Sequence, residues 1–400
     1  MDHDSIPFTR QLVAVRYGKI VAEQIAYTAP TPVSVPRTSL AFASVPDACS
    51  WIARTVLRKE EVDGPFDRWG GYEHAHAELV KNNLDQEPIV DCVVDALVRR
   101  QFPDARFARW PKGAAAAVCF SHDVDAFSGF SHFGLRQLFW ATQGKYATIR
   151  RWRSWRRSGF DPLVAFERWL DLEQSHGVKS TFFFLSLRRG LSREGRLYSV
   201  RAPEEKRILR MLVDHGWPIG LHAAYYRNLS QAYLVEQRER LEDAAGIQVN
   251  GTRHHYLRSR FPESWSLYTE AGFSYSSNLA WGRGHQGFRG GTSVPFFPIV
   301  NGKRLPLVEI PFQLMDSSSY TEKQEHAAIG QFTHYLQAAK RVGGCVVINF
   351  HSQYFEEQVA PRVNAVYRAI LKNVTSDPDV YVTTCDDLAR RLQDSPERPS

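Results

Sequence analysis

The stretch DPLVAFERWLDLEQSHGVKSTFFFL, residues 161–185, carries the pattern that decides the fold. An aspartate and a proline open an amphipathic helix with Leu163, Phe166 and Leu170 on one face, and Gly177 ends it. An unbroken apolar run, TFFFL, follows at once, as in a strand that is buried on both faces. A helix that leads directly into such a strand is the repeating unit of a parallel α/β sheet.

The same unit returns twice. Pro203 opens a helix that ends before a strand at 218–222, and Pro262 opens one that ends before a strand at 273–276. Further strands are expected at residues 116–120, 248–253, 307–312, 345–350 and 380–384. This pattern predicts an α/β fold, a distorted (β/α) barrel of about 7–8 parallel strands, with a doubly wound sheet as the alternative.

The beginning of the 400-residue chain has a different pattern. Residues 11–15 and 20–27 read as a hairpin, and residues 47–58 and 88–100 as helices. We therefore expect a small N-terminal α+β appendage, residues 1–112, followed by the barrel, residues 113–395.

Composition excludes several classes of protein. With 43% hydrophobic and 23% charged residues, the chain is not disordered. Five cysteines without a CxxC pair make a disulfide framework or a thiolate zinc site improbable. No apolar run approaches the roughly 18 residues of a membrane span, and the acidic start does not resemble a signal peptide. We expect a cytoplasmic protein, with a peripheral position at the inner membrane face left open.

Polar residues follow four of the predicted strands, and the carboxyl ends of parallel strands meet at one rim. An Asp and His ligand set without Cys suits Zn²⁺ or a similar divalent ion. A further carboxylate would act as base and a histidine as acid, so the pattern indicates hydrolysis. The residues are Asp123, Asp125, His222, Arg253, His254, His255 and His351.

These residues lie in motifs that resemble the polysaccharide deacetylase family, the NodB-homology carbohydrate esterases, over about residues 113–393. The motifs are FSHDVD at 120–125, KSTFFF at 179–184, GLH at 220–222, TRHHYL at 252–257 and VINFH at 347–351. A surface-polysaccharide-associated bacterial branch is indicated by GFRGGT at 287–292, PFFP at 295–298, EIP at 309–311 and LMD at 314–316.

The resemblance implies metal-dependent removal of an N- or O-acetyl group from a sugar in a glycan precursor. It makes Asp123 the base that activates water, with Arg253 orienting it, and His351 the acid that protonates the departing amine. It also makes Asp125 and His222 ligands of the metal, and it places a backbone N–H near Tyr256 at the carbonyl oxygen.

Two positions depart from the family pattern. Tyr226 stands where the second motif has another histidine, so the third ligand must come from elsewhere. His255 is our candidate, with Tyr226 and His254 as alternatives. Ser276 stands where this branch often has an aspartate, which removes a charge near Arg253.

Other residues suggest how substrate is held. Tyr225, Tyr256 and Trp281 lie in rim loops where their rings could stack on sugars, and Arg289 could meet an acidic sugar or phosphate. Residues 138–157 hold six basic residues, three tryptophans and no acid. They suit an insertion over the barrel mouth, or a membrane surface or lipid-phosphate contact. No sequence-specific motif supports a nucleic-acid partner.

Two other functions fit the same residues. A glycan- or lipid-carrier-binding barrel could have kept the fold while its metal site decayed, as Tyr226 and Ser276 suggest. A deformylase or other amidase acting on a lipid-linked sugar would need the same catalytic groups.

Overall fold

The computed structural model describes residues 4–67, 70–125, 162–187, 199–225, 230–282, 284–316, 325–355, 357 and 360–394. The basic segment 138–157 and Tyr226 lie outside these residues. The α-helices are α1 (Ser5–Tyr17), α2 (Lys19–Gln24), α3 (Val45–Val56), α4 (Glu78–Lys81), α5 (Ile89–Gln101), α8 (Pro162–Ser175), α9 (Pro203–Asp214), α10 (Gln231–Ala245), α11 (Glu263–Glu270), α13 (Glu325–Val342), α14 (Pro361–Thr375) and α15 (Cys385–Asp394). The strands are β1 (Val33–Ser34), β2 (Ala41–Phe42), β3 (Ala116–Val124), β4 (Thr181–Leu185), β5 (Ile219–Ala223), β6 (Gly251–His254), β7 (Tyr275–Ser276), β8 (Ile299–Val300), β9 (Lys303–Arg304), β10 (Val308–Glu309), β11 (Leu314–Met315), β12 (Cys345–Asn349) and β13 (Val380–Thr383).

The main sheet follows the chain almost in sequence. Its order is β10-β7-β6-β5-β4-β3-β12-β11, with β13 beside the first half of β3, and every pairing is parallel. Read from β3, the strands run around a curved surface to β10, and β11 and β12 return to β3. No pairing between β10 and β11 occurs among the described residues, so the ring is open there. This order confirms the distorted barrel and excludes the doubly wound sheet.

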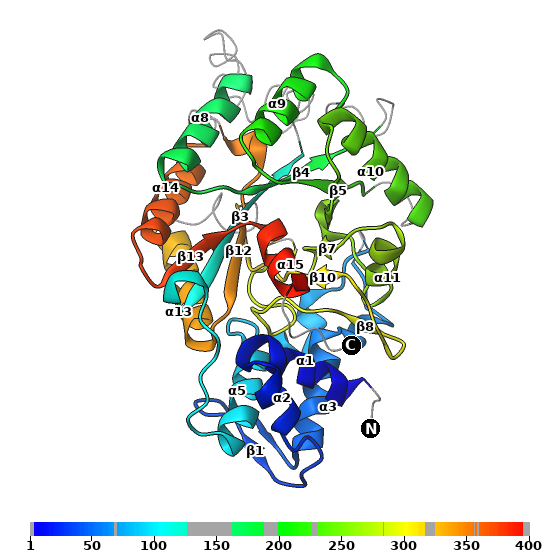
Figure 1. Cartoon of the computed structure of the whole chain (residues 1–400), viewed down its shortest axis with the longest axis vertical. Helices are drawn as coiled ribbons and strands as arrows, with labels where there is room; N and C mark the ends of the chain where they lie inside the picture. The colour runs from blue at the N-terminus through cyan, green and yellow to red at the C-terminus, as the bar shows by residue number, and fades with distance from the viewer. Residues whose placement is uncertain are drawn as a thin grey trace.

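Alternation along β3 divides the interior into two layers. Ala116, Val118 and Phe120 belong to the core between the sheet and the surrounding helices, whereas Ala117 and Cys119 face the inside of the curved sheet. The inner layer also contains Cys385, Leu388 and Ala389 of α15, the helix that crosses the front of the sheet in Figure 1. Helix α15, the last helix of the described chain, therefore contributes to the core inside the barrel.

The N-terminal part differs from its prediction. The expected hairpin at residues 11–15 and 20–27 is wrong, because these residues lie in or beside α1 and α2. Helix α1 buries Phe8, Leu12 and Val13 against neighbouring elements, and burial on several sides hides the helical period. The helices at 47–58 and 88–100 are confirmed as α3 and α5, and the short pair β1 and β2 makes this part α+β.

The N-terminal helices pack against one end of the barrel (Figure 1). Gln11 exchanges hydrogen bonds with the backbone of Phe297, from its amide Nε2 to O at 3.1 Å and from N to its Oε1 at 2.7 Å. Asp91 accepts hydrogen bonds from Thr292 and Ser293. These bonds tie the loop between β7 and β8 to the N-terminal helices.

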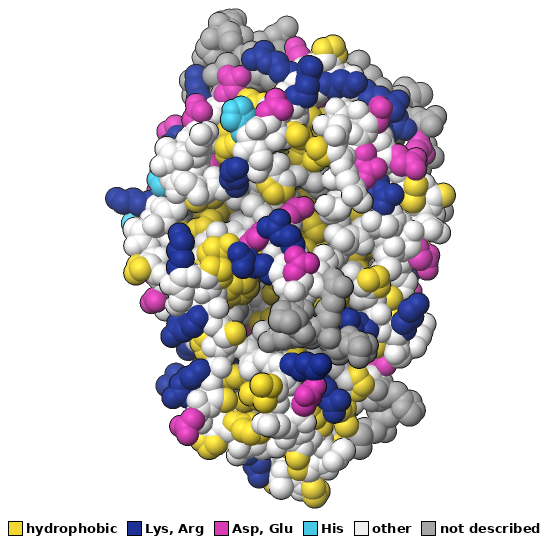
Figure 2. Space-filling view, viewed as in Figure 1, with side chains coloured by type: hydrophobic (Ala, Val, Ile, Leu, Met, Phe, Trp, Pro, Cys, Tyr) yellow, Lys and Arg dark blue, Asp and Glu magenta, His cyan; other side chains and the backbone are white. Residues whose placement is uncertain are grey.

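None of the described helices is long and apolar enough to cross a membrane. On the face in Figure 2, lysine and arginine side chains are interspersed with aspartate and glutamate. Among the described side chains, positive charge on this face is therefore mixed with negative charge.

Candidate active site

The ends of the parallel strands bring the predicted polar residues together. Asp123 is the second-to-last residue of β3, and Asp125 directly follows that strand. His222 of β5 is in register with Arg253 of β6, and His351 comes two residues after β12. The structure thus places residues that are more than 200 positions apart in sequence at one rim.

Asp125, His222 and His255 form a cluster that suits a metal ion. Each offers one ligand atom, and these atoms lie within 4.8 Å of one another. Nε2 of His222 lies 3.1 Å from Oδ1 of Asp125 and Nε2 of His255 lies 3.5 Å from Oδ2. Nδ1 of His222 is 2.9 Å from the carbonyl oxygen of Arg253, which fixes the ring and leaves Nε2 for a ligand.

Buried atoms without hydrogen-bond partners test whether the cluster fits a metal ion. Within the described part of the chain, Oδ1 of Asp125 and Nε2 of His222 are both buried without a hydrogen-bond partner. Buried polar atoms normally have a partner, and these two face each other across the cluster. One carboxylate and two imidazoles are a ligand set that zinc and similar ions accept. The residues present therefore fit a divalent ion.

His254 and His255 are adjacent in sequence, but their rings contact different groups. The ring nitrogens of His254 lie 3.3 Å from the hydroxyl of Tyr268 and 3.2 Å from the carbonyl oxygen of Ala224, away from the cluster. His255 instead lies over His222, with ring centroids 5.0 Å apart. The geometry favours His255 over His254 as the third ligand, and Tyr226 lies outside the described residues.

Asp123 is held from two sides. Nη1 of Arg253 donates to its Oδ1 at 3.0 Å, and Nδ2 of Asn349 donates to its Oδ2 at 3.0 Å. The Arg253 guanidinium lies 4.4 Å from the ring centroids of both Phe183 and Phe312. This aromatic sandwich and these two donors fix the carboxylate, and sequence reasoning had missed Asn349.

Asn349 left a signal in the sequence. It ends the apolar run CVVIN of β12, where a buried amide needs partners, and it lies two residues before His351. Its Oδ1 accepts a hydrogen bond from Nη1 of Arg253 at 2.9 Å. Asn349 therefore links the arginine and the carboxylate that it orients.

The charges of the site support ionised carboxylates. Burial raises the pKa of Asp123, but the nearby His222 and Arg253 bring it below its ordinary value. Burial also raises the pKa of Asp125, and His255 and His351 hold it well below its ordinary value. Both carboxylates are therefore charged near neutral pH, one able to accept a proton and the other able to bind a cation.

His351 is paired with a second aspartate. Its Nδ1 lies 2.5 Å from Oδ1 of Asp316, and its backbone N–H donates to Oδ2 at 2.7 Å. Burial lowers the pKa of His351, but the carboxylates of Asp316 and Asp125 raise it to about 10 overall. Its Nε2 lies 3.7 Å from Oδ2 of Asp125. The imidazole is thus a protonated acid at the edge of the cluster.

Although position 276 is a serine and not an acid, a buried carboxylate from another strand lies beside it. The buried carboxylate of Glu309 accepts hydrogen bonds from Ser276 and from the backbone N–H groups of Asn278 and Leu279. The same turn presents the backbone oxygen and hydroxyl of Ser277 to Arg253, at 3.0 and 2.9 Å. Glu309 thus fixes the loop that positions the arginine.

The four predicted substrate residues differ in exposure. Tyr256 is 47% exposed, and its ring stacks on His255 with centroids 4.2 Å apart. Tyr225 is buried beneath Tyr256 and the guanidinium of Arg258, so it supports the rim without presenting a face. Trp281 and Arg289 are also buried, and both line a pocket with Tyr256.

Arg289 does not offer a free charge. Its guanidinium binds both carboxylate oxygens of Glu61, at 2.6 and 3.0 Å, and donates to the carbonyl oxygen of Ala280. The expectation that it meets an acidic sugar or phosphate is therefore not supported by its surroundings, because its charge is already compensated.

Comparisons with known proteins agree with this fold. No family model matches the chain, and no curated protein matches it. Among solved structures, a protein from Mycobacterium smegmatis assigned to the polysaccharide deacetylases is 23% identical with a TM-score of 0.51, covering 72% of this chain and 93% of that one. One from Pseudomonas aeruginosa with the same assignment is 16% identical, with a TM-score of 0.49, over 72% and 95% of the two chains. The first likeness carries the fold alone, and the second is too weak to add to it.

Proposed function

We propose that this chain, which has the fold of the polysaccharide deacetylases, is a metal-dependent hydrolase that removes the N-acetyl group from a sugar of a surface-polysaccharide or other glycan precursor. One observation carries the proposal. Asp125, His222 and His255 offer a divalent ion three ligand atoms within 4.8 Å of one another, and Asp123 and His351 lie beside them.

The residues divide the work of hydrolysis. When bound, a divalent ion such as Zn²⁺ polarises the acetyl carbonyl and lowers the pKa of water. Asp123, held in place by hydrogen bonds from Arg253 and Asn349, accepts a proton from the attacking water. His351, kept protonated by Asp316, donates a proton to the departing nitrogen. The products are acetate and a free amine.

The turn after His255 supports a role in holding the carbonyl oxygen. Tyr256 and Leu257 both adopt positive φ, at 59° and 51°, which is unusual for residues with side chains. Such backbone conformations gather at active sites, where they aim backbone groups. We assign the backbone N–H near Tyr256 to the oxygen on which negative charge develops.

The proposal includes a place for the reaction. We propose a cytoplasmic enzyme, acting on a soluble precursor or, at the inner membrane face, on a lipid-linked one. The basic segment 138–157 would make the lipid-phosphate contact in the second case, since its charge suits an anionic headgroup.

Acetate release tests the proposal. Purified protein supplied with Zn²⁺ or Co²⁺ should release acetate from N-acetylated oligosaccharides, and chelation should stop it. Asp123→Asn should abolish release while the bound metal remains. Acetate from O-acetylated sugars only would replace the amide with an ester as substrate, and formate from N-formylated sugars would make the protein a deformylase.

A binding protein without activity is the second candidate. It is favoured by Tyr226, which stands where the related motif has a metal-binding histidine. Metal content separates the two candidates, because about one tightly held ion per chain is expected of the enzyme. A protein that binds no divalent ion and yields no acetate from any substrate would be the binding protein.

A further inference from the structure

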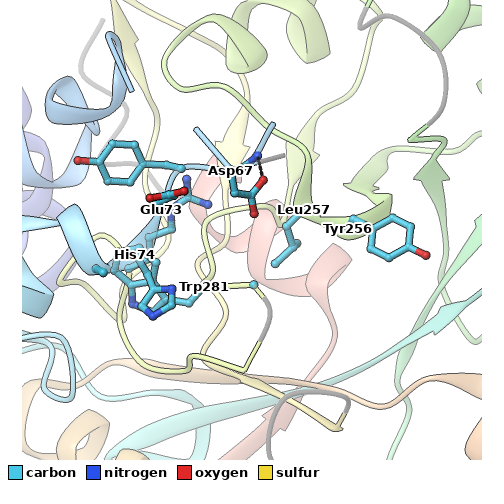
Figure 3. A pocket seen from close by; sticks show the side chains of 11 residues that line it. Asp67, Glu73, His74, Tyr256, Leu257 and Trp281 are labelled. Carbon is cyan, nitrogen blue, oxygen red and sulfur yellow. Dashed lines mark hydrogen bonds between the residues drawn. The ribbon is translucent and has the colours of Figure 1, made fainter. Parts of the chain in front are cut away.

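A pocket lies between the N-terminal part of the chain and the rim loops of the barrel. Its volume is about 280 Å³, and its walls come from Asp67 and residues 71–75 on one side and from residues 256–257, 281–282 and 289 on the other. Figure 3 shows Tyr256 and Leu257 at one end, His74 and Trp281 at the other, and Asp67 and Glu73 between them. We infer that this pocket binds a neutral or amino sugar next to the sugar that is deacetylated, an inference that rests on the proposed function.

The pocket begins beside the candidate active site. Tyr256 immediately follows the metal-ligand candidate His255, and the two rings are stacked. Tyr256 is half-exposed and is one of the residues that line the pocket, and in Figure 3 its ring points away from the other labelled side chains. The backbone at residues 256–257 thus joins the candidate metal site to the pocket wall, and a glycan of more than one sugar would extend from the site toward the pocket.

The charges of the pocket select the kind of sugar. Asp67 and Glu73 place carboxylates on its N-terminal wall. Arg289, the one arginine among the described residues of the lining, is already bound by both oxygens of Glu61. Carboxylates accept hydrogen bonds from sugar hydroxyls and attract an ammonium group, but they repel uronates and phosphates. The lining therefore favours a neutral sugar or one that already carries a free amine.

Trp281 adds an unsatisfied donor to the far wall. Its side chain is 4% exposed, and among the described residues its indole N–H has no hydrogen-bond partner. The ring is fixed by His74 and His285, with centroids at 6.5 and 5.5 Å. An unpaired buried N–H costs free energy, which an oxygen of a bound sugar would recover.

The N-terminal part therefore contributes to specificity as well as to packing. Glu61 anchors Arg289 behind the pocket, and Asp85 holds His285 at 2.7 Å, so the same part of the chain supplies one wall and supports the other. A barrel of this kind without such an appendage would have an open rim at this point.

Binding measurements without turnover test the inference. In an Asp123→Asn background, calorimetry would compare N-acetylglucosamine with its β-1,4-linked trisaccharide. We expect the trisaccharide to bind more tightly, and Trp281→Phe or Glu73→Gln to weaken its binding by about tenfold, the effect of one lost hydrogen bond to a sugar. Trp110→Phe and Glu23→Gln, which remove similar groups elsewhere, are the matched controls.

A charged ligand tests selection. A hyaluronan tetrasaccharide alternates N-acetylglucosamine with a uronate, and it should bind more weakly than the trisaccharide. Glu73→Gln should reduce the difference in affinity between the two oligosaccharides. The inference is overturned if neither pocket variant weakens trisaccharide binding, if the trisaccharide does not bind at millimolar concentration, or if the hyaluronan fragment binds as tightly. Because no turnover is needed, a protein that binds in this way but releases no acetate would fail the proposed function alone.

Discussion

At the scale of single residues, the motifs predicted which side chains meet but not how they are held. Asp123 and His222 lie near the ends of their strands and His351 follows β12, so their convergence is a consequence of parallel pairing. Asn349 and Asp316 were not assigned roles because the sequence shows a polar residue at a strand end but not which distant strand supplies its hydrogen-bond partner. Their partners became evident only when β12 was placed beside β3 and β11.

Asn349 should act as a positioning residue for the base. Asn349→Leu removes the donor to Oδ2 of Asp123, so kcat should fall roughly ten- to a hundredfold. KM for the glycan and the metal content should change little, because Asn349 contacts neither group in the proposed site. Steady-state kinetics and metal analysis check this. An unchanged kcat, or a loss of metal that accounts for the loss of activity, would contradict the role.

The third metal ligand can be identified by comparing adjacent histidines. His255→Ala should reduce bound Zn²⁺ from about one ion per chain to well below one, because it removes one of three ligand atoms. His254→Ala removes a ring that contacts Tyr268 and the Ala224 carbonyl, so it should lower stability but keep the metal. Metal analysis after gel filtration distinguishes them. If Tyr226→Phe loses the metal and His255→Ala does not, the assignment fails.

At the scale of elements, the positions of proline and glycine were sufficient to predict where helices begin and end when a strand follows directly. Helices expected from Asp161, Pro203 and Pro262 correspond to α8, α9 and α11, within a few residues at each end. The failure at α1 has a physical cause. A helix that packs against α3, α5 and the barrel has no continuous polar face. Its sequence therefore lacks the helical period of apolar residues on which the prediction depends.

Close approach between elements is a further property that the sequence hides. A Cβ at Gly251 of β6 would lie 1.9 Å from Cζ of Tyr275, whose ring crosses the inside of the barrel. The hydroxyl of Tyr275 reaches Asp386 at the beginning of α15, at 2.6 Å. The glycine, the tyrosine and the last helix thus depend on one another across 135 residues of sequence.

Two adjacent aspartates in α15 should have opposite effects on stability. Burial raises the pKa of Asp386 to about 6, only partly offset by the Tyr275 hydrogen bond. Because the folded chain holds this proton more tightly, stability falls as the pH rises from about 4 to 6, by about 2–3 kcal/mol. Asp386→Asn, which still accepts from Tyr275, should therefore stabilise the protein at pH 8 and have little effect at pH 4.

Asp387 provides the matched comparison. Burial raises its pKa, but hydrogen bonds from Arg391, Thr383 and Arg390 lower it to about 2. The stability that it contributes is present above the unfolded pKa, near 4, and is lost as the pH falls toward 2. Asp387→Asn should thus destabilise the protein at pH 8. Urea unfolding at the two pH values measures both variants, and effects of the same sign at pH 8 would refute this account.

At the scale of the whole molecule, the sequence predicted an appendage and a barrel but not their dependence on each other. The division at residue 112 stays a prediction, since a single core contains both Val94 of α5 and Val118 of β3. Arg16 of α1 donates to the backbone oxygens of Asp91 and Val342, which joins the two parts. Such contacts are between distant residues, and composition or periodicity cannot show them.

A buried ionic link between the two parts is the cluster around Glu61. This carboxylate is 2% exposed and binds Arg58 at 2.8 Å and Arg289 at 2.6 Å, and Arg58 also donates to the Arg289 carbonyl oxygen at 2.8 Å. Glu61→Ala would leave two buried guanidiniums without their shared partner. We expect a loss of about 3–5 kcal/mol in the free energy of unfolding, the usual effect of breaking a buried ion pair.

The same variant tests whether the molecule unfolds as a unit. Because the cluster joins the N-terminal part to the rim loop, Glu61→Ala should lower the midpoint of one transition seen alike by tryptophan fluorescence and far-ultraviolet circular dichroism. Glu23→Ala, which removes an exposed ion pair at 3.7 Å in the same part of the chain, should change stability by less than about 1 kcal/mol. Two separate unfolding transitions, with only one midpoint lowered by Glu61→Ala, would mean that the appendage and the barrel unfold independently. The N-terminal wall of the pocket would then belong to a different folding unit from the active site.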